Sequence, residues 1–271
     1  MSEKQKADPP LSGTSTRTSN LENERPILVI PGLGSFGWKL AAQRLAAQAR
    51  RSGLFESTAV IDERFLRKYM SDFVRSHGQF LSRHKRGWGY WLWKPWIVRH
   101  FLDSGSSIKG LVYLDAGCEL NVNPTSRRRW SQYIDVAHQE GLLSFSLRDP
   151  LVRWCKRDLL SRLDIGCHEV DIRVHEAGIL FLKRNDLTNC LLNSWLDISQ
   201  EANYRYLDDS PSELSNCDGF IEHRHDQAIW SALLHKNGYV GPFSESNFQG
   251  NWDSLGMNFP IWALRNPGPF A

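Results

Sequence analysis

The chain has 271 residues, enough for one large or two small domains with a sizeable buried core. Apolar residues make up 41% and charged residues 23%, as in ordinary soluble globular proteins, and the formal net charge is only +3. So small a charge argues against nucleic acid as the partner. We find no run of about 18 apolar residues and no N-terminal signal pattern, which argues against a membrane-spanning helix and against secretion. Peripheral membrane attachment stays open.

The cysteines give an expectation about compartment. There are five, an odd number, scattered along the chain without a C-x-x-C pair. This pattern argues against both a disulfide framework and a structural zinc site. We therefore expect a reducing compartment and a cytoplasmic location.

The first expected elements follow a polar tail. Residues 1–24 hold almost no large apolar side chain and cannot offset the entropy of ordering, so we expect disorder there. Residues 27–30 then predict a buried strand, 31–37 a loop, and the apolar spacing after the loop a helix. A second strand is predicted at 58–61. The loop contains G-x-G but lacks the spacing of a dinucleotide-binding fingerprint.

An unusual aromatic segment spans residues 86–96. Its sequence, R-G-W-G-Y-W-L-W-K-P-W, places four of the 11 tryptophans beside two glycines, two cations and a proline. Glycine lets the backbone approach a ligand closely, and broad aromatic faces suit a sugar ring or a base. We interpret the segment as a binding surface. The alternative is that its tryptophans are ordinary core residues.

Within this segment, Pro95 predicts the start of a helix over 96–102, because proline is favoured at the first helical position. Lys94 would then stand at the helix N-terminus, where a cation opposes the helix dipole. That arrangement makes sense if an anion such as a diphosphate shares the site with the free backbone N–H groups. A basic run lies farther along the chain, at 127–129, and we interpret it as the solvated start of a helix.

The remaining pattern alternates strands and helices. Strands are predicted at 110–114, 142–145 and 178–182, and helices at 156–163, from Asp186 through Trp195, and around 229–234. Such alternation predicts an α/β fold with a mainly parallel sheet flanked by helices. From residue 241 onward the chain is rich in Gly, Pro, Asn and aromatics. We expect residues 241–271 to be an irregular segment packed on the domain.

Asp115 directly follows the predicted strand at 110–114. In open α/β sheets, ligands bind outside the carboxyl ends of the strands. A carboxylate there can hold a divalent metal that neutralises a diphosphate, or can accept hydrogen bonds from a ribose or sugar hydroxyl. The alternative is that Asp115 only caps a turn. Glu119 is either a second acidic contact or a surface residue.

Five motifs occur in a fixed order and carry a family resemblance. They are R-G-W-G-Y-W-L-W-K-P at 86–95, Y-L-D-A-G at 113–117, W-C-K-R-D at 154–158, E-A-G-I at 176–179 and H-R-H-D-Q at 223–227. Together they resemble glycosyltransferases with the nucleotide-diphospho-sugar (GT-A) fold. The likeness is stronger to bacterial polysaccharide- and capsule-type transferases with G-Y-W-x-W-K-P and Y-x-D-A-G motifs. It spans most of residues 26–240.

The resemblance implies a single GT-A-like, Rossmann-type domain over 25–240 that transfers a sugar from a nucleotide-diphosphate donor to a hydroxyl of a saccharide or other acceptor. The implied setting is polysaccharide or glycoconjugate synthesis. The implied catalytic residues are Asp115, Glu176 and Asp226. The implied donor-binding residues are Ser35, Arg86, Gly87, Tyr90, Trp93, Lys94, Asp115, Ala116, Gly117, Ala177 and Gly178. The implied acceptor-binding residues are Trp154, Lys156, Asp158, His225 and Gln227.

One departure from the family pattern concerns the metal. The family carries D-x-D, whereas Gly117 stands at the second aspartate position here. Asp115 would be the ligand of Mn²⁺ or Mg²⁺, with Asp226 or Glu119 completing the shell. Otherwise Lys94, Arg86 and a helix N-terminus would stabilise the diphosphate without metal. His223 and His225 form H-x-H, but zinc would need further convergent ligands.

Two other functions stay open. The first is a non-catalytic carbohydrate-binding or scaffold protein with a degenerate glycosyltransferase fold, which the missing second aspartate favours. The second is a nucleotidyltransferase or nucleic-acid-binding protein that uses the basic aromatic stretch, and the small net charge argues against it. For a transferase, an inverting enzyme would use Asp226 or Glu176 as the general base. In a retaining enzyme the same groups would stabilise an oxocarbenium-like transition state.

Overall fold

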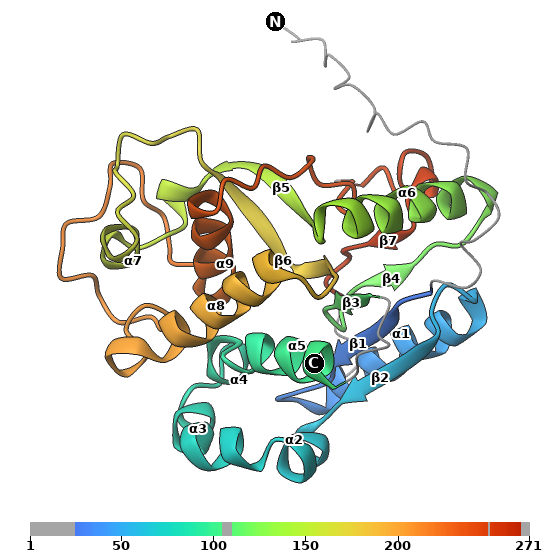
Figure 1. The fold of residues 1–271 in the computed structure, drawn as a ribbon, viewed down its shortest axis with the longest axis horizontal. Helices are drawn as coiled ribbons and strands as arrows, with labels where there is room; N and C mark the ends of the chain where they lie inside the picture. Colours follow the sequence, from blue (N-terminus) through green and yellow to red (C-terminus); the bar gives the residue numbers. More distant parts are fainter. Residues whose placement is uncertain (1–24, 105–109, 249, 267–271) are drawn as a thin grey trace, which may run out of the picture.

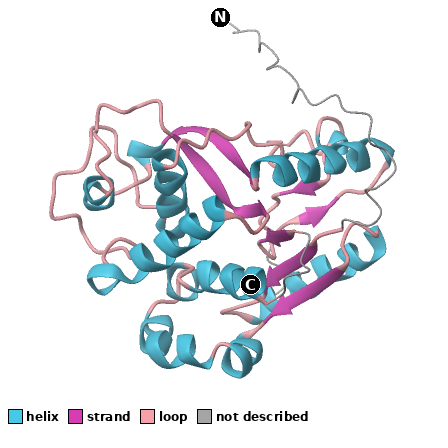
Figure 2. Cartoon of the chain, viewed as in Figure 1, coloured by secondary structure: helices cyan, strands magenta, loops and turns pink. Residues whose placement is uncertain are grey.

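Short apolar strands alternate with longer helices along the chain (Figure 1, Figure 2). The computed structural model describes residues 25–104, 110–248 and 250–266, so the tail expected at 1–24 lies outside the described residues. The strands are β1 (Ile27–Pro31), β2 (Ser57–Ile61), β3 (Leu111–Leu114), β4 (Glu119–Leu120), β5 (Leu142–Pro150), β6 (Arg173–Leu182) and β7 (Ile261–Trp262). The helices are α1 (Phe36–Ser52), α2 (Glu63–Tyr69), α3 (Ser71–Arg83), α4 (Gly87–Tyr90), α5 (Trp93–Asp103), α6 (Pro124–Glu140), α7 (Arg157–Arg162), α8 (Asp186–Tyr204) and α9 (His225–Lys236).

The central sheet has five strands in the order β2-β1-β3-β6-β5. Strand β1 pairs in parallel with β2 and with β3, whereas β6 pairs antiparallel with β3 and with β5. Four strands therefore point the same way and β6 points the opposite way. The expected class, a single α/β domain with a mainly parallel sheet flanked by helices, is confirmed.

The sheet is covered by helices on both faces. Along β1, Leu28 and Ile30 pack with residues of α1 and α6, while Val29 packs with residues of α5, α8 and α9. Successive strand residues point to opposite faces, so a strand buried on both sides reads as a continuous apolar run. This is why β1 and β3 were recognisable from sequence.

Several helix boundaries differ from the sequence prediction. Helix α5 begins at Trp93, two residues before Pro95, because proline is tolerated anywhere in a first turn whose N–H groups lack intrahelical partners. The cap of α8 is Asn185, which accepts a hydrogen bond from the Thr188 N–H (2.8 Å), rather than Asp186. Helices α2 and α3 had not been predicted. The basic run 127–129 lies in the first turns of α6.

The segment after residue 240 returns across the sheet. Phe243 forms a bridge with Ser146 of β5, and β7 pairs with β4. The Ala263 N–H then donates to the Ser246 carbonyl (2.7 Å), and the Asn266 N–H to the Gly117 carbonyl (3.1 Å). The chain end thereby reaches the loop that follows β3.

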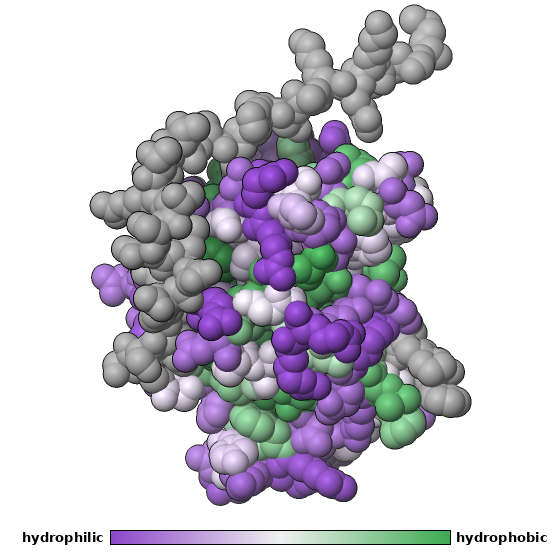
Figure 3. Space-filling model, turned by 90° about the vertical axis from the view of Figure 1, so that its right-hand side faces the viewer, coloured by the Kyte–Doolittle hydropathy of each residue, from purple (hydrophilic) through white to green (hydrophobic). Residues whose placement is uncertain are grey.

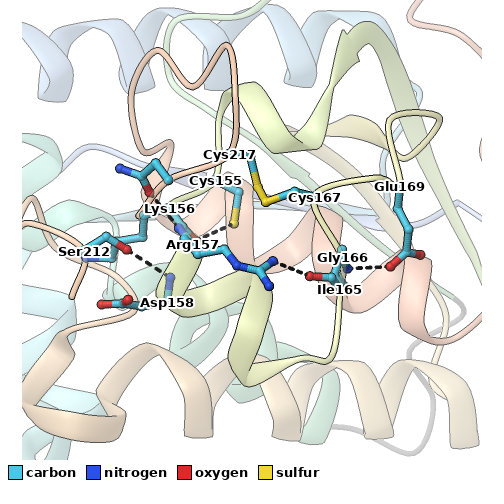
Figure 4. The surroundings of a disulfide bond; sticks show 11 residues. Cys155, Lys156, Arg157, Asp158, Ile165, Gly166, Cys167, Glu169, Ser212 and Cys217 are labelled. Carbon is cyan, nitrogen blue, oxygen red and sulfur yellow. Dashed lines mark hydrogen bonds between the residues drawn. A yellow bond between two sulfur atoms is a disulfide. The ribbon is translucent and has the colours of Figure 1, made fainter. Parts of the chain in front are cut away.

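A disulfide joins Cys167 to Cys217, with 5.4 Å between their Cα atoms and a sequence separation of 50 (Figure 4). The expectation of a chain without disulfides was therefore wrong. The pairing depends on two loops meeting in space, which cysteine spacing alone does not reveal. Cys118 and Cys155 are free and buried, and Cys190 is free and exposed.

The face drawn in Figure 3 mixes hydrophilic and hydrophobic residues. Among the helices of the described ranges, none is both long and apolar enough to cross a bilayer.

Candidate functional site

The candidate site lies at the carboxyl end of β3, where Asp115 follows the strand. The Asp115 N–H donates to the Gly178 carbonyl (2.8 Å), which continues the β3–β6 pairing by one residue. The Tyr113 hydroxyl donates to Asp115 Oδ1 (2.7 Å). About 40% of the Asp115 side chain is exposed, so this carboxylate can reach a ligand.

Lys94 lies beneath Asp115, in the first turn of α5, with 3% of its side chain exposed. Its Nζ lies 2.6 Å from Asp226 Oδ2 and 3.7 Å from Asp115 Oδ1, and it donates to the Ala177 carbonyl (3.0 Å). Burial lowers the Lys94 pKa, but the charges of Asp115 and Asp226 outweigh it and leave the pKa above its ordinary value. Lys94 is therefore charged and internally paired. The structure thus places Lys94 against two carboxylates and a carbonyl, and its expected contact with a diphosphate stays a prediction.

Asp226 stands in the first turn of α9 and is 4% exposed. Burial raises its pKa to about 6, against the opposing effect of the Lys94 charge. The preceding residue, His225, has a φ of +48°, which is uncommon outside glycine and turns the chain sharply into the helix. The start of α9 thus sets the carboxylate of Asp226 against the ammonium of Lys94.

Glu176 lies on β6, two residues before Gly178, and is 9% exposed. Its Oε1 accepts hydrogen bonds from the hydroxyls of Ser244 (2.5 Å) and Ser246 (2.7 Å), and its Oε2 has no hydrogen-bond partner among the described residues. Burial raises the Glu176 pKa, while the two serines and the charge of Arg265 lower it in part. Glu176 is thus held by the segment after residue 240.

Ala177 and Gly178 line the site mainly through their backbone. Ala177 is buried and offers its carbonyl to Lys94. At Gly178, a Cβ atom would lie 2.6 Å from Asp115 Oδ2, which is too close for any side chain. Gly178 therefore leaves room for the Asp115 carboxylate.

The first part of the aromatic segment forms one turn of left-handed helix. Residues 87–91 all have positive φ, between +45° and +86°. The Tyr90 N–H donates to the Arg86 carbonyl (2.9 Å) and the Trp91 N–H to the Gly87 carbonyl (3.2 Å). This conformation costs a non-glycine residue roughly 1–2 kcal/mol. Backbone strain of this kind persists only where surrounding packing enforces it, and it is concentrated at functional sites.

The two glycines of this turn serve packing rather than ligand approach. A Cβ on Gly87 would lie 2.4 Å from the Trp91 ring, and one on Gly89 would lie 2.5 Å from Leu81 Cδ2. Trp93 Nε1 donates to the Gly87 carbonyl (3.0 Å). Tyr90 is 7% exposed. Tyr90 and Trp93 are buried and Gly87 is half-buried, so the structure places all three in packing contacts, and their role in donor binding stays a prediction.

Two polar residues expected at the site, Arg86 and His225, contact a loop. Arg86 forms ion pairs with Asp209 (3.6 Å) and Glu222 (3.4 Å). His225 Nδ1–H donates to the Leu207 carbonyl (2.8 Å), and the His225 ring stacks on Tyr90 with 4.7 Å between the ring centroids. Both side chains thus secure the chain that leads into α9.

Lys156 and Asp158 hold the same loop, close to the disulfide (Figure 4). Lys156 Nζ donates to the carbonyls of Asp208 (3.0 Å) and Ser210 (3.2 Å). Burial would raise the Asp158 pKa, but hydrogen bonds from backbone N–H groups and from Arg205 outweigh it and lower the pKa to about 2. Both side chains make internal contacts in the structure, and acceptor binding at 156 and 158 stays a prediction.

The other two expected acceptor residues also make internal contacts. The Trp154 ring lies 4.0 Å beneath the Arg224 guanidinium. Gln227 Nε2 donates to the His175 carbonyl (2.9 Å) on β6. These contacts fix the start of α9 against the sheet, so both residues support the position of Asp226.

A cavity of about 240 Å³ opens at the carboxyl ends of β1 and β2, which the sequence had not indicated as a site. It is lined by Gly32, Lys39, Gln43, Val60, Asp62 and Phe65. Because β1 lies between β2 and β3, this cavity and Asp115 belong to the same edge of the sheet. Ser35, which was expected to bind the donor, is the N-cap of α1 and follows Gly32 of the cavity closely in sequence. Its Oγ accepts a hydrogen bond from the Trp38 N–H (3.4 Å). The available signal was the position of Gly32 in the loop after the first predicted strand and of Asp62 directly after the second.

Residues 263–266, which we call the C-terminal strap, cross the loop after β3. Arg44 of α1 donates to the carbonyls of Ala116, Cys118 (each 3.2 Å) and Asn266 (3.3 Å). A Cβ on Gly117 would lie 2.9 Å from Arg265 Cα. The second aspartate of a D-x-D motif therefore has no room beneath the strap.

The residues present do not fit the expected Mn²⁺ or Mg²⁺ site. In the described ranges, no three His, Cys, Asp or Glu side chains converge as a metal site would require. Asp226 is turned to Lys94, and Glu119 accepts from Asn266 Nδ2 (3.0 Å) on the strap. Neither acid completes a shell around Asp115.

The chain is similar to two solved structures of glycosyltransferases. Neither the family models nor the curated proteins contain a match to this chain. Among solved structures, the apo form of mouse xyloside xylosyltransferase 1 is similar, with 12% identity, a TM-score of 0.46, and coverage of 91% of this chain and 100% of that one. A glycosyltransferase involved in glycosylation of the major capsid of PBCV-1 is also similar, with 10% identity, a TM-score of 0.44, and coverage of 88% and 91%. At these scores the likeness carries no functional argument.

Proposed function

We propose that the chain is a glycosyltransferase that moves a sugar from a nucleotide-diphosphate donor to a hydroxyl of a saccharide or other acceptor. The observation that carries the proposal is the exposed carboxylate of Asp115 at the end of β3. The same sheet edge holds the cavity at the carboxyl ends of β1 and β2. Ligands of open α/β sheets bind at this edge. A nucleoside in the cavity would direct its diphosphate and sugar along the edge toward Asp115. Polysaccharide or glycoconjugate synthesis is the setting we propose.

The buried residues around Asp115 support it in this role. Tyr113 and Lys94 hold one carboxylate oxygen, and Asp226 holds Lys94 from the other side. A carboxylate fixed in this way can accept hydrogen bonds from a ribose or sugar hydroxyl without reorganising. Tyr113, Lys94 and Asp226 then act as positioning residues.

In the proposed reaction, the acceptor hydroxyl oxygen bonds to the anomeric carbon of the donor sugar. The bond between that carbon and the diphosphate oxygen breaks, and the nucleoside diphosphate leaves with the electron pair. The acceptor proton passes to a carboxylate of the site. Asp115 and Glu176 are the candidates, and Asp115 is the more exposed of the two.

The test is release of nucleoside diphosphate from a panel of UDP-, GDP- and dTDP-activated sugars, with and without mono- and oligosaccharide acceptors. Asp115→Asn should lower turnover at least about 100-fold, the loss typical of removing one preorganised electrostatic contact. Circular dichroism should show an unchanged fold, because the side chain is partly exposed. The matched control is Arg128→Gln, an exposed residue of α6.

Full turnover in Asp115→Asn would contradict the role of this carboxylate. The absence of an acid at 117 favours a second candidate, a carbohydrate-binding protein without catalysis. Glycan binding by the wild type without release from any donor would support that candidate instead.

A further inference from the structure

The charges beneath Asp115 create a problem for a diphosphate leaving group. Lys94 carries one positive charge, and it lies against two carboxylates, those of Asp115 and Asp226. The three groups together are therefore negative when both acids are ionised. A departing diphosphate develops further negative charge, which needs a cation at the open side of the site.

The C-terminal strap brings a cation to this point. Arg265 is exposed, and no ion pair within the described part of the chain uses its guanidinium. The positive charge of Arg265 lowers the pKa of Glu176, so the guanidinium is close enough to act on the site. Among the described residues, the cations Lys94 and Arg44 near Asp115 already pair with acids, whereas Arg265 does not.

The strap is held firmly where it passes the loop after β3. Its Asn266 N–H donates to the Gly117 carbonyl (3.1 Å), and Ala263 is hydrogen-bonded to Ser246 (2.7 Å), whose hydroxyl binds Glu176. Arg265 has a φ of +52°, a left-handed conformation that costs a non-glycine residue energy. Strain of this kind is kept only where the surroundings enforce it. The backbone thus fixes Arg265 over Gly117.

We propose that Arg265 is the cation that binds the donor diphosphate and stabilises it as it leaves, so that transfer proceeds without a divalent metal. The proposal rests on the glycosyltransferase function proposed above. Gly117 is then a requirement of the mechanism, since it lets the strap carry a guanidinium to the place where a D-x-D protein holds its second acid. A guanidinium matches two phosphate oxygens with parallel N–H groups.

The group transfer balances without a co-reactant. The acceptor oxygen gains the sugar, the diphosphate oxygen keeps the electron pair of the broken bond, and the acceptor proton moves to a carboxylate. Arg265 keeps its protons throughout and offers hydrogen bonds that strengthen as the diphosphate charge grows.

The first test measures binding rather than turnover. Dissociation constants for UMP and UDP, and for the GMP/GDP, CMP/CDP and dTMP/dTDP pairs, are measured by calorimetry in EDTA and in Mn²⁺. For the base that binds, the wild type should favour the diphosphate over the monophosphate equally in both solutions. Arg265→Gln should reduce the diphosphate affinity at least about tenfold, as expected for a lost charged hydrogen bond, with little change for the monophosphate. Arg265→Lys should retain part of the preference for the diphosphate, and Arg128→Gln should retain all of it.

The second test measures turnover with the active donor. The wild type should be equally active in EDTA and in Mn²⁺, and Arg265→Gln should lose about 100-fold in kcat/KM. Activity abolished by EDTA and restored by Mn²⁺, or full activity in Arg265→Gln, would overturn the role of Arg265 while leaving the glycosyltransferase function intact. A wild type that binds none of the nucleotides would overturn both.

Discussion

Lys94 and Asp226 form a buried ion pair, with 2.6 Å between Nζ and Oδ2 and side-chain exposures of 3% and 6%. The two residues come from the first turns of α5 and α9, so the pair joins two helices beneath the carboxylate of Asp115. Desolvation makes a buried pair costly to form, but removing one partner is costlier, because it leaves an uncompensated charge in the interior. The pair therefore constrains the site more than it stabilises the fold.

We expect Lys94→Met to lower the free energy of unfolding by about 3–5 kcal/mol, the cost typical of breaking a buried ion pair. Urea unfolding followed by tryptophan fluorescence measures this loss. The control is Arg99→Met, which breaks the half-exposed Arg99–Asp103 pair on the same helix and should cost no more than about 1 kcal/mol.

The double variant Lys94→Met/Asp226→Leu separates the pair from its parts. Because both charges are then absent, it should recover much of the stability that Lys94→Met loses. Equal losses in Lys94→Met and Arg99→Met, or no recovery in the double variant, would contradict the buried pair.

The pH dependence of turnover should report on Asp226. Its pKa is raised to about 6, because burial outweighs the Lys94 charge. Above that pH the carboxylate is ionised and holds Lys94, and below it the pair is lost. We therefore expect kcat/KM to fall as the pH drops through about 6, and Asp226→Asn to lack this acidic limb. A limb unchanged in Asp226→Asn would assign it to another group.

Stability responds to Asp226 in the opposite direction. Between the ordinary aspartate pKa near 4 and about 6, folded Asp226 binds a proton that the unfolded chain has released. Its contribution to the free energy of unfolding therefore falls as the pH rises through this window. Asp226→Asn should remove that part of the slope, which urea unfolding at several pH values can measure.

Local patterns made one half of the site predictable. Asp115 was predicted as a site residue because an apolar strand ends directly before it. The strand and the acid lie within a few residues of each other, so one local pattern contains both. Asp226 was found through its motif at a helix start. The cavity was missed although Gly32 and Asp62 also follow strands, because single residues at strand ends are common and carry little information.

The other half depends on contacts that no local pattern encodes. Lys94 was predicted at a helix N-terminus, and its pairing with Asp226 of α9 was not foreseen. Lys156 and Asp158 were predicted to bind an acceptor, and their contacts with the loop that Cys217 anchors were not foreseen. These contacts have the same physical cause, because burial and ion pairing are set by segments distant in sequence.

The left-handed turn at 87–91 leads to a prediction with an internal control. Gly89 has a φ of +86°, and a Cβ there would lie 2.5 Å from Leu81 Cδ2. Gly53, at the C-cap of α1, has a φ of +68° with no heavy atom within 4 Å of such a Cβ. Gly53→Ala should cost about 1 kcal/mol from backbone strain alone, and Gly89→Ala about 2–4 kcal/mol because overpacking adds to it. Equal losses of unfolding free energy would mean that Leu81 moves aside freely.

The disulfide between Cys167 and Cys217 closes a loop of about 50 residues and lies beside the segment that binds Arg86 and His225. A cross-link over such a loop restricts the unfolded chain, with a stabilisation of typically about 2–4 kcal/mol. Cys167→Ser/Cys217→Ser should lose this amount in urea unfolding.

Reduction should lower the free energy of unfolding only in variants that contain the Cys167–Cys217 disulfide. Dithiothreitol should destabilise the wild type to the level of the double variant and leave that variant unchanged. Cys190→Ser, which removes a free exposed thiol, should behave as the wild type in both solutions. The segment that contains Cys217 also leads into α9 and positions it. The reduced protein should therefore show a larger loss of turnover than of helix content by circular dichroism. An unfolding midpoint that is the same before and after reduction would show that the two cysteines are unpaired.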